Sequence, residues 1–455
     1  MEIDRTEAML SGPILPLLLK MATPQALGFV VQGSISIAEI WFIGQLGTTG
    51  LAGMALVFPL LMLIQMLSTA AIGGAVTGAI ARALGSGDTQ RAQAILWHVV
   101  YLAIGLALLL VIIHFTAGEA VLRLLGGEDD VLQQALDYTS ILFPGCIVMW
   151  LFNMMLCVER GTGNVQLPAM LMILGAIIQV PLSGALILGW GLFPQLGIKG
   201  AAISILIVNT INVGILIILH VFGRLTVQFD RRFRSFKGEL IADILSAGAL
   251  AAVSPFFTVL SILIMTGLVG RFGTEALAGY GIAARVEFLV LPLVFGIGVS
   301  MTTLVGLNIG RGNIDRAERI GWIGGIVAGV LCGSAGILLA LFPEFWTTIF
   351  SKEPKTIAVA SDYFRITAPF FGFLGMGLSL YLASQGAKAV GWPVFATMLR
   401  FVITIGGGWM IVTRFNGDLK SLFMCVSAAV VVYAGTTCGA IYMGAWRKTE
   451  NKPAT

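Results

Sequence analysis

The motifs GSGDTQRA (residues 85–92) and GRGNIDRA (residues 310–317) are near-copies of each other, half a chain apart. Three more pairs of segments recur in the same order at almost the same separation of 225 residues. These pairs are GTGNVQLP (161–168) with GAKAVGWP (386–393), Asp137-Tyr138 with Asp362-Tyr363, and GQLGTTGLAG (44–53) with GRFGTEALAG (270–279). Matched blocks in a conserved order indicate an internal duplication. We therefore predict two similar domains, residues 1–225 and 226–455.

The composition of the chain is that of a membrane protein. Of its 455 residues, 57% are hydrophobic and 11% are charged, whereas about a quarter are charged in ordinary soluble domains. Crossing a bilayer as helix takes about 20 mostly apolar residues, and lipid offers no partner to an unpaired backbone group. The apolar stretches therefore predict helices, at residues 13–43, 49–83, 89–117, 131–160, 165–190, 198–222, 239–270, 274–309, 315–343, 356–386, 392–413 and 419–445.

The number of crossings predicts the topology. Six crossings per half is an even number, so each half starts and ends on the same side of the membrane and the halves lie parallel. The predicted fold is all-α and polytopic, with about twelve transmembrane helices in two parallel-repeat six-helix lobes. Sixteen Lys and Arg residues fall on the side of the N-terminus and seven on the other side. Because positive charge accumulates in cytoplasmic loops, we expect both termini to be cytoplasmic and the protein to lie in the cell membrane, the bacterial inner membrane.

Several classes of function are disfavoured. The net charge is only +4, and the basic residues lack the aromatic interleaving of a nucleic-acid surface. The five cysteines lie in apolar stretches, without CxxC spacing or nearby histidines, so no metal site is predicted. GxSxG, Walker and HExxH motifs are absent and the three histidines lie far apart, which argues against an enzyme and against ATP as the energy source. The N-terminus is acidic, unlike a signal peptide, so we expect the first helix to be retained.

Glu39, in the segment SISIAEIWFIG (34–44), is the ionisable residue most clearly placed within a predicted membrane helix. A charge at bilayer depth costs about 3 kcal/mol or more unless it is neutralised, paired or hydrated. Apolar surroundings favour the protonated form of a carboxyl group, which makes proton uptake and release feasible near neutral pH. We therefore predict that Glu39 takes up and releases an ion. The alternative is a structural acid, hydrogen-bonded to Ser34, Ser36 or another helix.

Other ionisable residues within the predicted helices are weaker candidates. Arg285 and Glu287 stand two residues apart and so face different directions on a helix. At most one of them then lines a central cavity, and a structural role is equally open for both. Arg400, on the eleventh predicted helix, is a candidate partner of Glu287.

The two halves are joined by a basic segment, GRLTVQFDRRFRSFKGE (223–239). Positive residues beside a membrane helix determine its orientation during insertion, and they also attract anionic lipid headgroups. We favour the first role. Asp137 and Asp362 occupy repeated positions near the ends of predicted helices, which favours a structural role for them over substrate binding.

The repeated blocks resemble the signatures of the multidrug and toxic compound extrusion (MATE) transporters. The resemblance rests on ARALGSGDTQRA and LNIGRGNIDRA, on RGTGNVQLP and SQGAKAVGWP, and on FIGQLGTTGLAG. It covers nearly the whole chain, in both halves and in order. It implies twelve helices in two six-helix lobes around a central cavity, and export of cationic or amphipathic compounds by proton or sodium antiport.

The resemblance also implies roles for individual residues. The family carries an acid just before the glycine break of its first helix, in a pattern like VDxxFVGxLG, and IAEIWFIGQLG places Glu39 there. Pro24 resembles the proline at which this helix bends in the DinF-type branch. That branch has a pattern like NxxLD on its fifth helix, where this chain reads QVPLS, with Gln179 and Ser183 and without the aspartate. Asn153, on the fourth helix, resembles another member of the same polar cluster.

The NorM-type branch of the family instead has carboxylates in its second lobe. The positions that align with them here are Thr258 and Gly375, which are not acids. The resemblance is therefore closer to the DinF-type branch, and Glu39 is the coupling residue that remains. With one carboxylate in the first lobe rather than two, protons are favoured over sodium.

Together these observations predict a secondary antiporter that exports amphipathic or cationic small molecules by alternating access between two lobes. The predicted ion-coupling residues are Glu39, Asn153, Gln179 and Ser183, and the candidate cavity residues are Pro24, Arg285, Glu287 and Arg400. No cofactor is expected, because a proton or sodium gradient supplies the driving force. We expect a monomer that contacts its small-molecule substrate and membrane lipids. The alternative is a flippase for lipid-linked saccharides or lipids, from the same superfamily.

Overall fold

The computed structural model describes residues 2–415 and 417–447, with the backbone alone for residues 2–5 and 287–289. All secondary structure in this part of the chain is helical. Twelve helical segments within it are long and apolar enough to cross a bilayer. The all-α, polytopic fold predicted from the sequence is confirmed.

Six of these spans precede the basic linker and form the first half. They are α2 (Ile14–Gly44), then α3 (Thr48–Met66) running through the π-helical η1 (Leu67–Ala71) into α4 (Ile72–Gly85), α5 (Thr89–Leu124), α6 (Asp129–Gly161), α7 (Gln166–Leu188) and α8 (Ile198–Val221). A short helix, α1 (Glu2–Ser11), precedes them.

The second half repeats this order after a linker that contains the short 3-10 helix η2 (Arg231–Phe233). Its spans are α9 (Gly238–Gly270), α10 (Thr274–Gly310), α11 (Ile314–Leu341), α13 (Pro354–Thr367) continued by η3 (Ala368–Phe370) and α14 (Phe371–Gly386), α15 (Gly391–Phe401) continued by η4 (Val402–Gly407) and α16 (Gly408–Thr413), and α17 (Leu419–Tyr442). The short helix α12 (Glu344–Phe350) lies between α11 and α13.

The helices differ from the predicted ranges mainly in three places. The helices α1 and α12 were not predicted, because both are too short and too polar to stand out as spans. The helix α5 extends to Leu124 rather than ending at residue 117. Its last turns carry Glu119 and Arg123, whose side chains form an ion pair four residues apart, 2.8 Å between Oε1 and Nη2. Such an ion pair stabilises a helix that is exposed to water. Hydropathy does not detect helical turns of this kind, because they are not apolar.

The duplicated motif has the same local structure in both copies. Gly87 and Gly312 have φ angles of +81° and +79°, a left-handed conformation that glycine adopts without strain. Asp88 and Asn313 follow, and each side chain accepts a hydrogen bond from the backbone N–H three residues later, at 2.8 and 3.2 Å. These are N-caps of α5 and α11. The motif therefore ends one span and starts the next.

The repeated aspartates Asp137 and Asp362 also have matching environments. Asp137 pairs with Lys199 at 3.3 Å, and Asp362 pairs with Lys420 at 3.2 Å. Each lysine is the second residue of the sixth span of its half. Both pairs are partly exposed, so each contributes little to stability. Their positions fit the structural role predicted for both aspartates.

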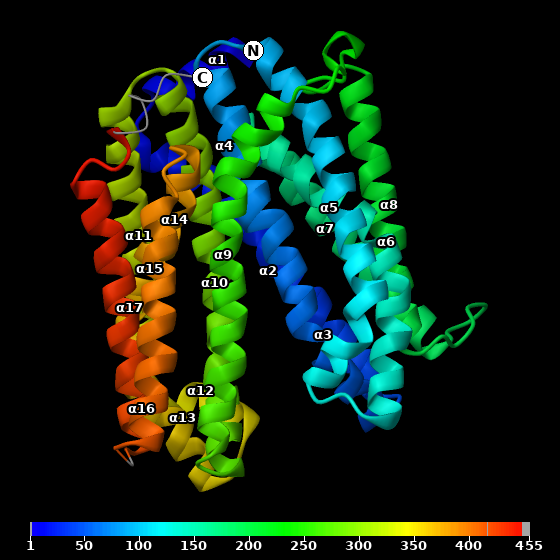
Figure 1. The fold of residues 1–455 in the computed structure, drawn as a ribbon, viewed down its shortest axis with the longest axis vertical. Helices are drawn as coiled ribbons and strands as arrows, with labels where there is room; N and C mark the ends of the chain where they lie inside the picture. Colours follow the sequence, from blue (N-terminus) through cyan, green and yellow to red (C-terminus); the bar gives the residue numbers. More distant parts are fainter. Residues whose placement is uncertain (1, 416, 448–455) are drawn as a thin grey trace.

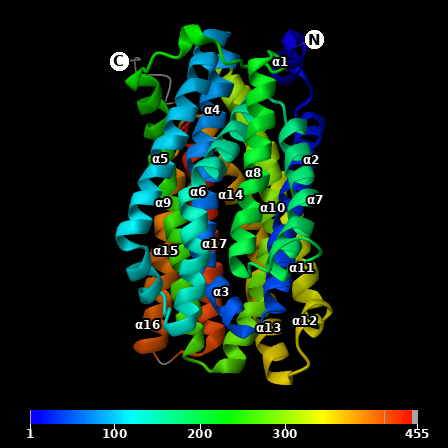
Figure 2. The ribbon, with the colours of Figure 1, turned by 90° about the vertical axis from the view of Figure 1, so that its right-hand side faces the viewer.

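Both described chain ends lie at one end of the molecule, which we call the termini end (Figure 1). The helices of the two halves meet there and diverge toward the opposite end; Figure 2 shows the first half from the side. The buried apolar clusters follow the same division. At the termini end, Leu18 and Met21 of the first half share a cluster with Ile297 and Met301 of the second. At the opposite end each half has a cluster of its own.

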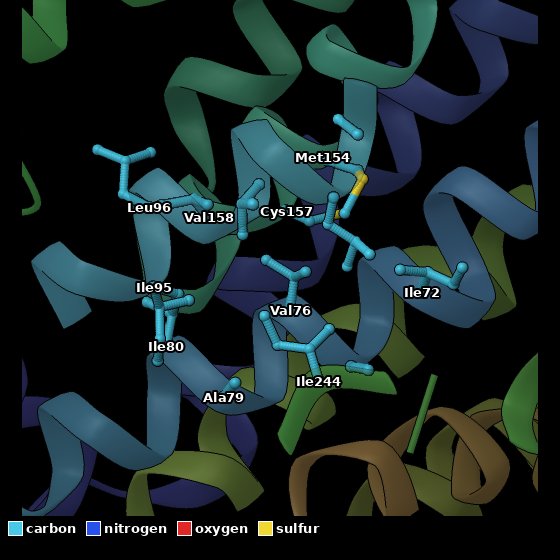
Figure 3. Packing of buried hydrophobic residues seen from close by; sticks show 14 of the residues in the cluster. Ile72, Val76, Ala79, Ile80, Ile95, Leu96, Met154, Cys157, Val158 and Ile244 are labelled. Atoms are coloured by element: carbon cyan, nitrogen blue, oxygen red, sulfur yellow. The ribbon is translucent and has the colours of Figure 1, made fainter. Parts of the chain in front are cut away.

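A second shared cluster at the termini end is centred on α4. Residues of α4, α5 and α6 pack around Val76 and Ile80, and Ile244 of α9 joins them from the second half (Figure 3). Burial of apolar side chains between the halves therefore holds them together at this end.

The halves approach most closely where α4 crosses α10. A Cβ atom on Gly85 would lie 2.1 Å from the carbonyl oxygen of Leu307, and one on Gly310 would lie 2.2 Å from that of Arg82. No real side chain fits at these distances. Small residues of this kind let two membrane helices bring their backbones into contact.

We expect Gly85→Ala to lower the melting temperature of the purified protein in detergent. The added methyl group must push α4 and α10 apart, and overpacking of this kind typically costs about 1–3 kcal/mol. Gly105→Ala is the matched control, since a Cβ atom there meets nothing within 4 Å in the middle of α5. Equal melting temperatures for the two variants would show that the helices are not in backbone contact.

Candidate functional site

Glu39 lies on α2, in the part of this helix near the opposite end of the molecule. Its side chain is 3% exposed. The helix packs along α7 of the same half through small residues. A Cβ atom on Gly28 would lie 3.3 Å from the Cα atom of Ala169, and one on Gly184 would lie 2.8 Å from the ring of Phe42. This close packing brings the polar face of α7 against Glu39.

Two side chains of α7 bind the carboxyl group of Glu39. Gln179 donates from Nε2 to Glu39 Oε1 at 3.0 Å, and the Ser183 hydroxyl donates to the same oxygen at 3.4 Å. Because Gln179 and Ser183 are four residues apart, they lie on one face of the helix, and both are buried. The structure thus brings together three of the four residues that were predicted to couple an ion.

No cation neutralises this carboxyl group among the described residues, where Glu39 forms no ion pair. Tyr138 of α6 is fully buried and close enough to interact with Glu39 electrostatically. Its hydroxyl has no hydrogen-bond partner in the described part of the protein. The surroundings of Glu39 are therefore two neutral donors and a phenol, an arrangement in which the carboxyl group can be held either protonated or ionised.

Asn153, the fourth residue predicted for this cluster, forms no hydrogen bond with Glu39 in the described part of the protein, and its hydrogen-bond partners lie on α3 and η1. Its Nδ2 donates to Ser68 Oγ at 2.9 Å and to Gln65 Oε1 at 3.3 Å. Ser68 belongs to η1, where the π-helical turn interrupts the second span. Asn153 and Tyr138 are both on α6, fifteen residues or about 22 Å apart along the helix. The participation of Asn153 in ion coupling therefore stays a prediction.

Pro24 lies within α2, half-buried, between Glu39 and the termini end. The next residue, Gln25, is fully buried and links three elements. It donates from Nε2 to the carbonyl oxygen of Val165 at 2.8 Å, and its Oε1 accepts from Arg160 Nε at 3.0 Å. Arg160 is 1% exposed, with its guanidinium group over the ring of Phe29 at 5.0 Å. The segment of α2 beside Pro24 is therefore anchored to α6.

The described second-half candidates, Arg285 and Arg400, contact aromatic rings of their own half. The guanidinium group of Arg285 lies over the ring of Phe350 at 5.5 Å, and that of Arg400 over the ring of Tyr433 at 5.8 Å. The side chain of Glu287 falls outside the described residues, and so does its predicted pairing with Arg400. Within the described chain, no group of three or more His, Cys, Asp or Glu side chains is placed to hold a metal ion.

Polar contacts also join the halves at the termini end. Arg82 of α4 donates from Nη1 to the carbonyl oxygens of Gln385 and Gly386, at 3.2 and 2.8 Å. Gln385 in turn donates to the carbonyl oxygen of Ala70 in η1, at 2.7 Å. Asp243 of α9 pairs with Arg91 of the first half at 3.1 Å.

The arginines of the duplicated motif make reciprocal contacts across the halves. Arg91, in the first half, reaches Asp243 near the start of α9, the first span of the second half. Arg316, at the equivalent position of the second half, donates to the carbonyl oxygen of Gly12, just before α2. Asp243 is additionally paired with Lys388 of its own half. We call Arg91, Asp243, Lys388, Arg316 and Gly12 the termini-end clasp.

Sequence reasoning missed Tyr138, Gln25, Arg160, Gln65 and Asp243. Arg91 and Arg316 were visible as repeated letters of the duplicated motif. The available signal for Gln25 was a polar residue directly after Pro24 in a predicted membrane helix. The pairing of Asp243 depends on how two distant helices meet, which no local pattern reports.

Comparisons with known proteins identify the family. The MatE family model matches the chain twice, at residues 24–184 and 251–410. A probable multidrug resistance protein NorM of Thermotoga maritima is 28% identical, over 84% of this chain and 82% of that protein. An FAD transporter of Shewanella oneidensis is also 28% identical, over 81% of each protein.

A solved structure extends this likeness to the fold. A MOP superfamily transporter from Pyrococcus furiosus superposes with a TM-score of 0.88 at 21% identity, over 97% of this chain and 98% of that one. The name NorM among the relatives gives no support to the DinF-type assignment. The duplicated motifs, the twelve spans and the repeated match of the family model agree: the chain is a membrane transporter of the MatE family, the multidrug and toxic compound extrusion proteins.

Proposed function

We propose that this protein is a secondary antiporter, which exports amphipathic or cationic small molecules in exchange for protons. The observation that carries the proposal is the state of Glu39: a buried carboxyl group at membrane depth, bound by two neutral donors and, among the described residues, by no cation. A permanently paired acid cannot release and take up an ion, whereas this one can do so when its surroundings change. The printed names of the relatives, for multidrug resistance and for FAD, support small molecules as the cargo.

The proposed transport cycle is alternating access between two lobes, residues 1–225 and 226–455. The contacts between the halves gather at the termini end, which we propose is cytoplasmic because the basic loops lie there. The structure then represents a state closed toward the cytoplasm. Opening that side requires the termini-end clasp to break. Arg91 is 47% exposed in its contact with Asp243, and pairs of this kind contribute roughly 1 kcal/mol or less, so the clasp can open on the timescale of transport.

Helix α2 is the proposed connection between ion binding and this movement. It contacts α7 at Glu39 and contacts α10 of the other half near Pro24, where a Cβ atom on Gly296 would lie 2.7 Å from the backbone nitrogen of Ala26. A proton on Glu39 alters the hydrogen bonds to Gln179 and Ser183. Any resulting shift of α2 is transmitted to the surface between the halves. Ion binding then biases two arrangements of the lobes that differ in substrate affinity.

We propose protons rather than sodium because Glu39 is the sole carboxylate among the residues described around it. Sodium sites in proteins need several oxygen ligands, and the amide of Gln179 presents its nitrogen to Glu39. The placement in the DinF-type branch rests on Pro24 and on Thr258 and Gly375, where the other branch carries acids. It remains a prediction.

We expect Glu39→Gln to lower the rate of dye export driven by an imposed pH gradient in proteoliposomes. A glutamine keeps the shape of the side chain but cannot exchange a proton. Coupling free energies of 1–3 kcal/mol correspond to about 5–150-fold in affinity, so the initial rate should fall at least about fivefold while the melting temperature stays near that of the wild type.

Glu344→Gln, at an exposed position, is the control and should transport normally. Export by Glu39→Gln at the wild-type rate would contradict the proposed mechanism. If Glu39→Gln lost export under a sodium gradient but kept it under a pH gradient, Glu39 would couple transport to sodium and not to protons. Movement of lipid-linked saccharides in place of dyes would favour the flippase alternative.

We expect Gln179→Leu to lower the free energy of unfolding by about 1–3 kcal/mol, because the carboxyl group of Glu39 is left with a weaker set of donors in a buried site. The double variant Glu39→Leu/Gln179→Leu should recover most of this loss, since both partners are then removed. Denaturant or thermal unfolding in detergent measures both. A double variant no more stable than Gln179→Leu would mean that the two side chains are not coupled.

A further inference from the structure

The linker between the halves, residues 222–237, is bound to α5 through its backbone. Three side chains of α5 hold it: Trp97 Nε1 donates to the carbonyl oxygen of Asp230 at 3.0 Å, the Tyr101 hydroxyl donates to that of Arg234 at 2.8 Å, and the N–H of Lys237 donates to His98 Nε2 at 2.7 Å. The other ring nitrogen of His98 lies 2.7 Å from the carbonyl oxygen of Ala94. The linker is therefore an ordered surface of the protein.

The apolar side of the linker faces the protein. Val227 is fully buried, and the ring of Phe229 packs edge-on against Trp97, with ring centroids 4.9 Å apart. The carbonyl oxygen of Val227 lies 2.7 Å from His220 Nδ1 at the end of α8. With its backbone, Val227 and Phe229 directed inward, the linker presents its basic side chains outward.

These basic side chains have no acidic partner in the part of the chain that the structure describes. Arg224, Arg231, Arg234 and Lys237 are exposed, and none forms an ion pair among the described residues. The only acid of the segment, Asp230, is bound by Arg232, with 2.6 Å between Oδ2 and Nη2. Hydrogen bonds from Arg232 lower the pKa of Asp230, so this pair stays ionised and cancels in charge. Four unpaired positive charges remain.

The linker lies at the level of the lipid headgroups. Helix α5 has 36 residues, about 54 Å of helix, against a hydrocarbon core about 30 Å thick. The linker is bound at Trp97 and Tyr101, two and three turns from the start of α5. Trp and Tyr gather at the membrane–water interface. Phe236, 66% exposed, lies beside the ring of Tyr101 on the same surface.

We propose that this surface, formed by Arg224, Arg231, Arg234, Lys237 and Phe236, binds the anionic headgroups of phospholipids in the adjacent leaflet. Guanidinium groups bind phosphate oxygens in pairs of parallel hydrogen bonds, and an exposed aromatic ring next to them enters the interface. The role of these basic residues in setting the orientation of the helices ends once the helices have inserted into the membrane. Lipid binding is a property of the folded protein and is independent of which ion or substrate is transported.

The test uses spin-labelled lipids with the full-length protein in vesicles of phosphatidylcholine. We expect spin-labelled phosphatidylglycerol to associate more strongly than spin-labelled phosphatidylcholine, and this preference to fall as salt is raised. In the triple variant R231Q/R234Q/K237Q, the ratio of phosphatidylglycerol association to phosphatidylcholine association should fall at least about fivefold. Each Lys or Arg near an anionic surface contributes about that factor to the affinity. The backbone atoms that bind α5 are retained in this variant, so its melting temperature should match that of the wild type.

The matched control is R271Q/K352Q/R414Q, which removes three exposed cations at the opposite end of the molecule. It should keep the lipid preference. An unchanged preference in the linker variant, or an equal loss in the control, would overturn the proposal. So would abolition of the preference by millimolar inorganic phosphate at constant ionic strength, because the site would then recognise a small free anion and not a lipid surface.

Discussion

The backbone contact between α4 and α10 is the constraint on which the rest of the structure depends. Gly85 and Gly310 let the two spans touch at the termini end, where apolar clusters and polar contacts from both halves also gather. Toward the opposite end each half is held by its own cluster. A molecule packed in this way can change shape at low cost only by moving one half against the other, because each half keeps its own core.

The termini-end clasp shows how duplication can produce a switch. Equivalent arginines of the two motifs each reach the start of the opposite half, but their partners differ: Arg91 meets the carboxylate of Asp243, and Arg316 meets a backbone carbonyl. Two weak polar contacts of this kind can be exchanged for water when the halves separate at the termini end. In the proposed cycle, α2 connects this region to Glu39, because it touches α10 near Pro24 and α7 near its far end.

The sequence predicted most of the fold and part of the site. The twelve spans follow from hydropathy because lipid demands long apolar helices, and the duplication is visible in the motifs themselves. Glu39 was selected as an acid within a predicted membrane helix and again by resemblance, whereas Gln179 and Ser183 were selected by resemblance alone. Their contact depends on the register of α2 against α7, which small residues such as Gly28 and Gly184 determine. Asn153 was assigned to the same cluster by resemblance too, and its hydrogen bonds to Gln65 and Ser68 could not be predicted because they depend on how α6 packs against the π-helical turn η1. Asp243 was missed, since its first-half partner is 152 residues away.

The most direct test of the central claim is a paired distance measurement by electron spin resonance, with the five native cysteines replaced. One label pair, at exposed Gln90 and Arg319, spans the halves at the termini end, and another, at exposed Thr49 and Thr274, spans them at the opposite end. If the halves rock against each other under the control of Glu39, so that the termini end opens as the opposite end closes, a change of pH across neutrality should lengthen one distance and shorten the other, and Glu39→Gln should abolish this response. Two distances that change in the same direction, or that respond to pH equally in Glu39→Gln, would contradict the account.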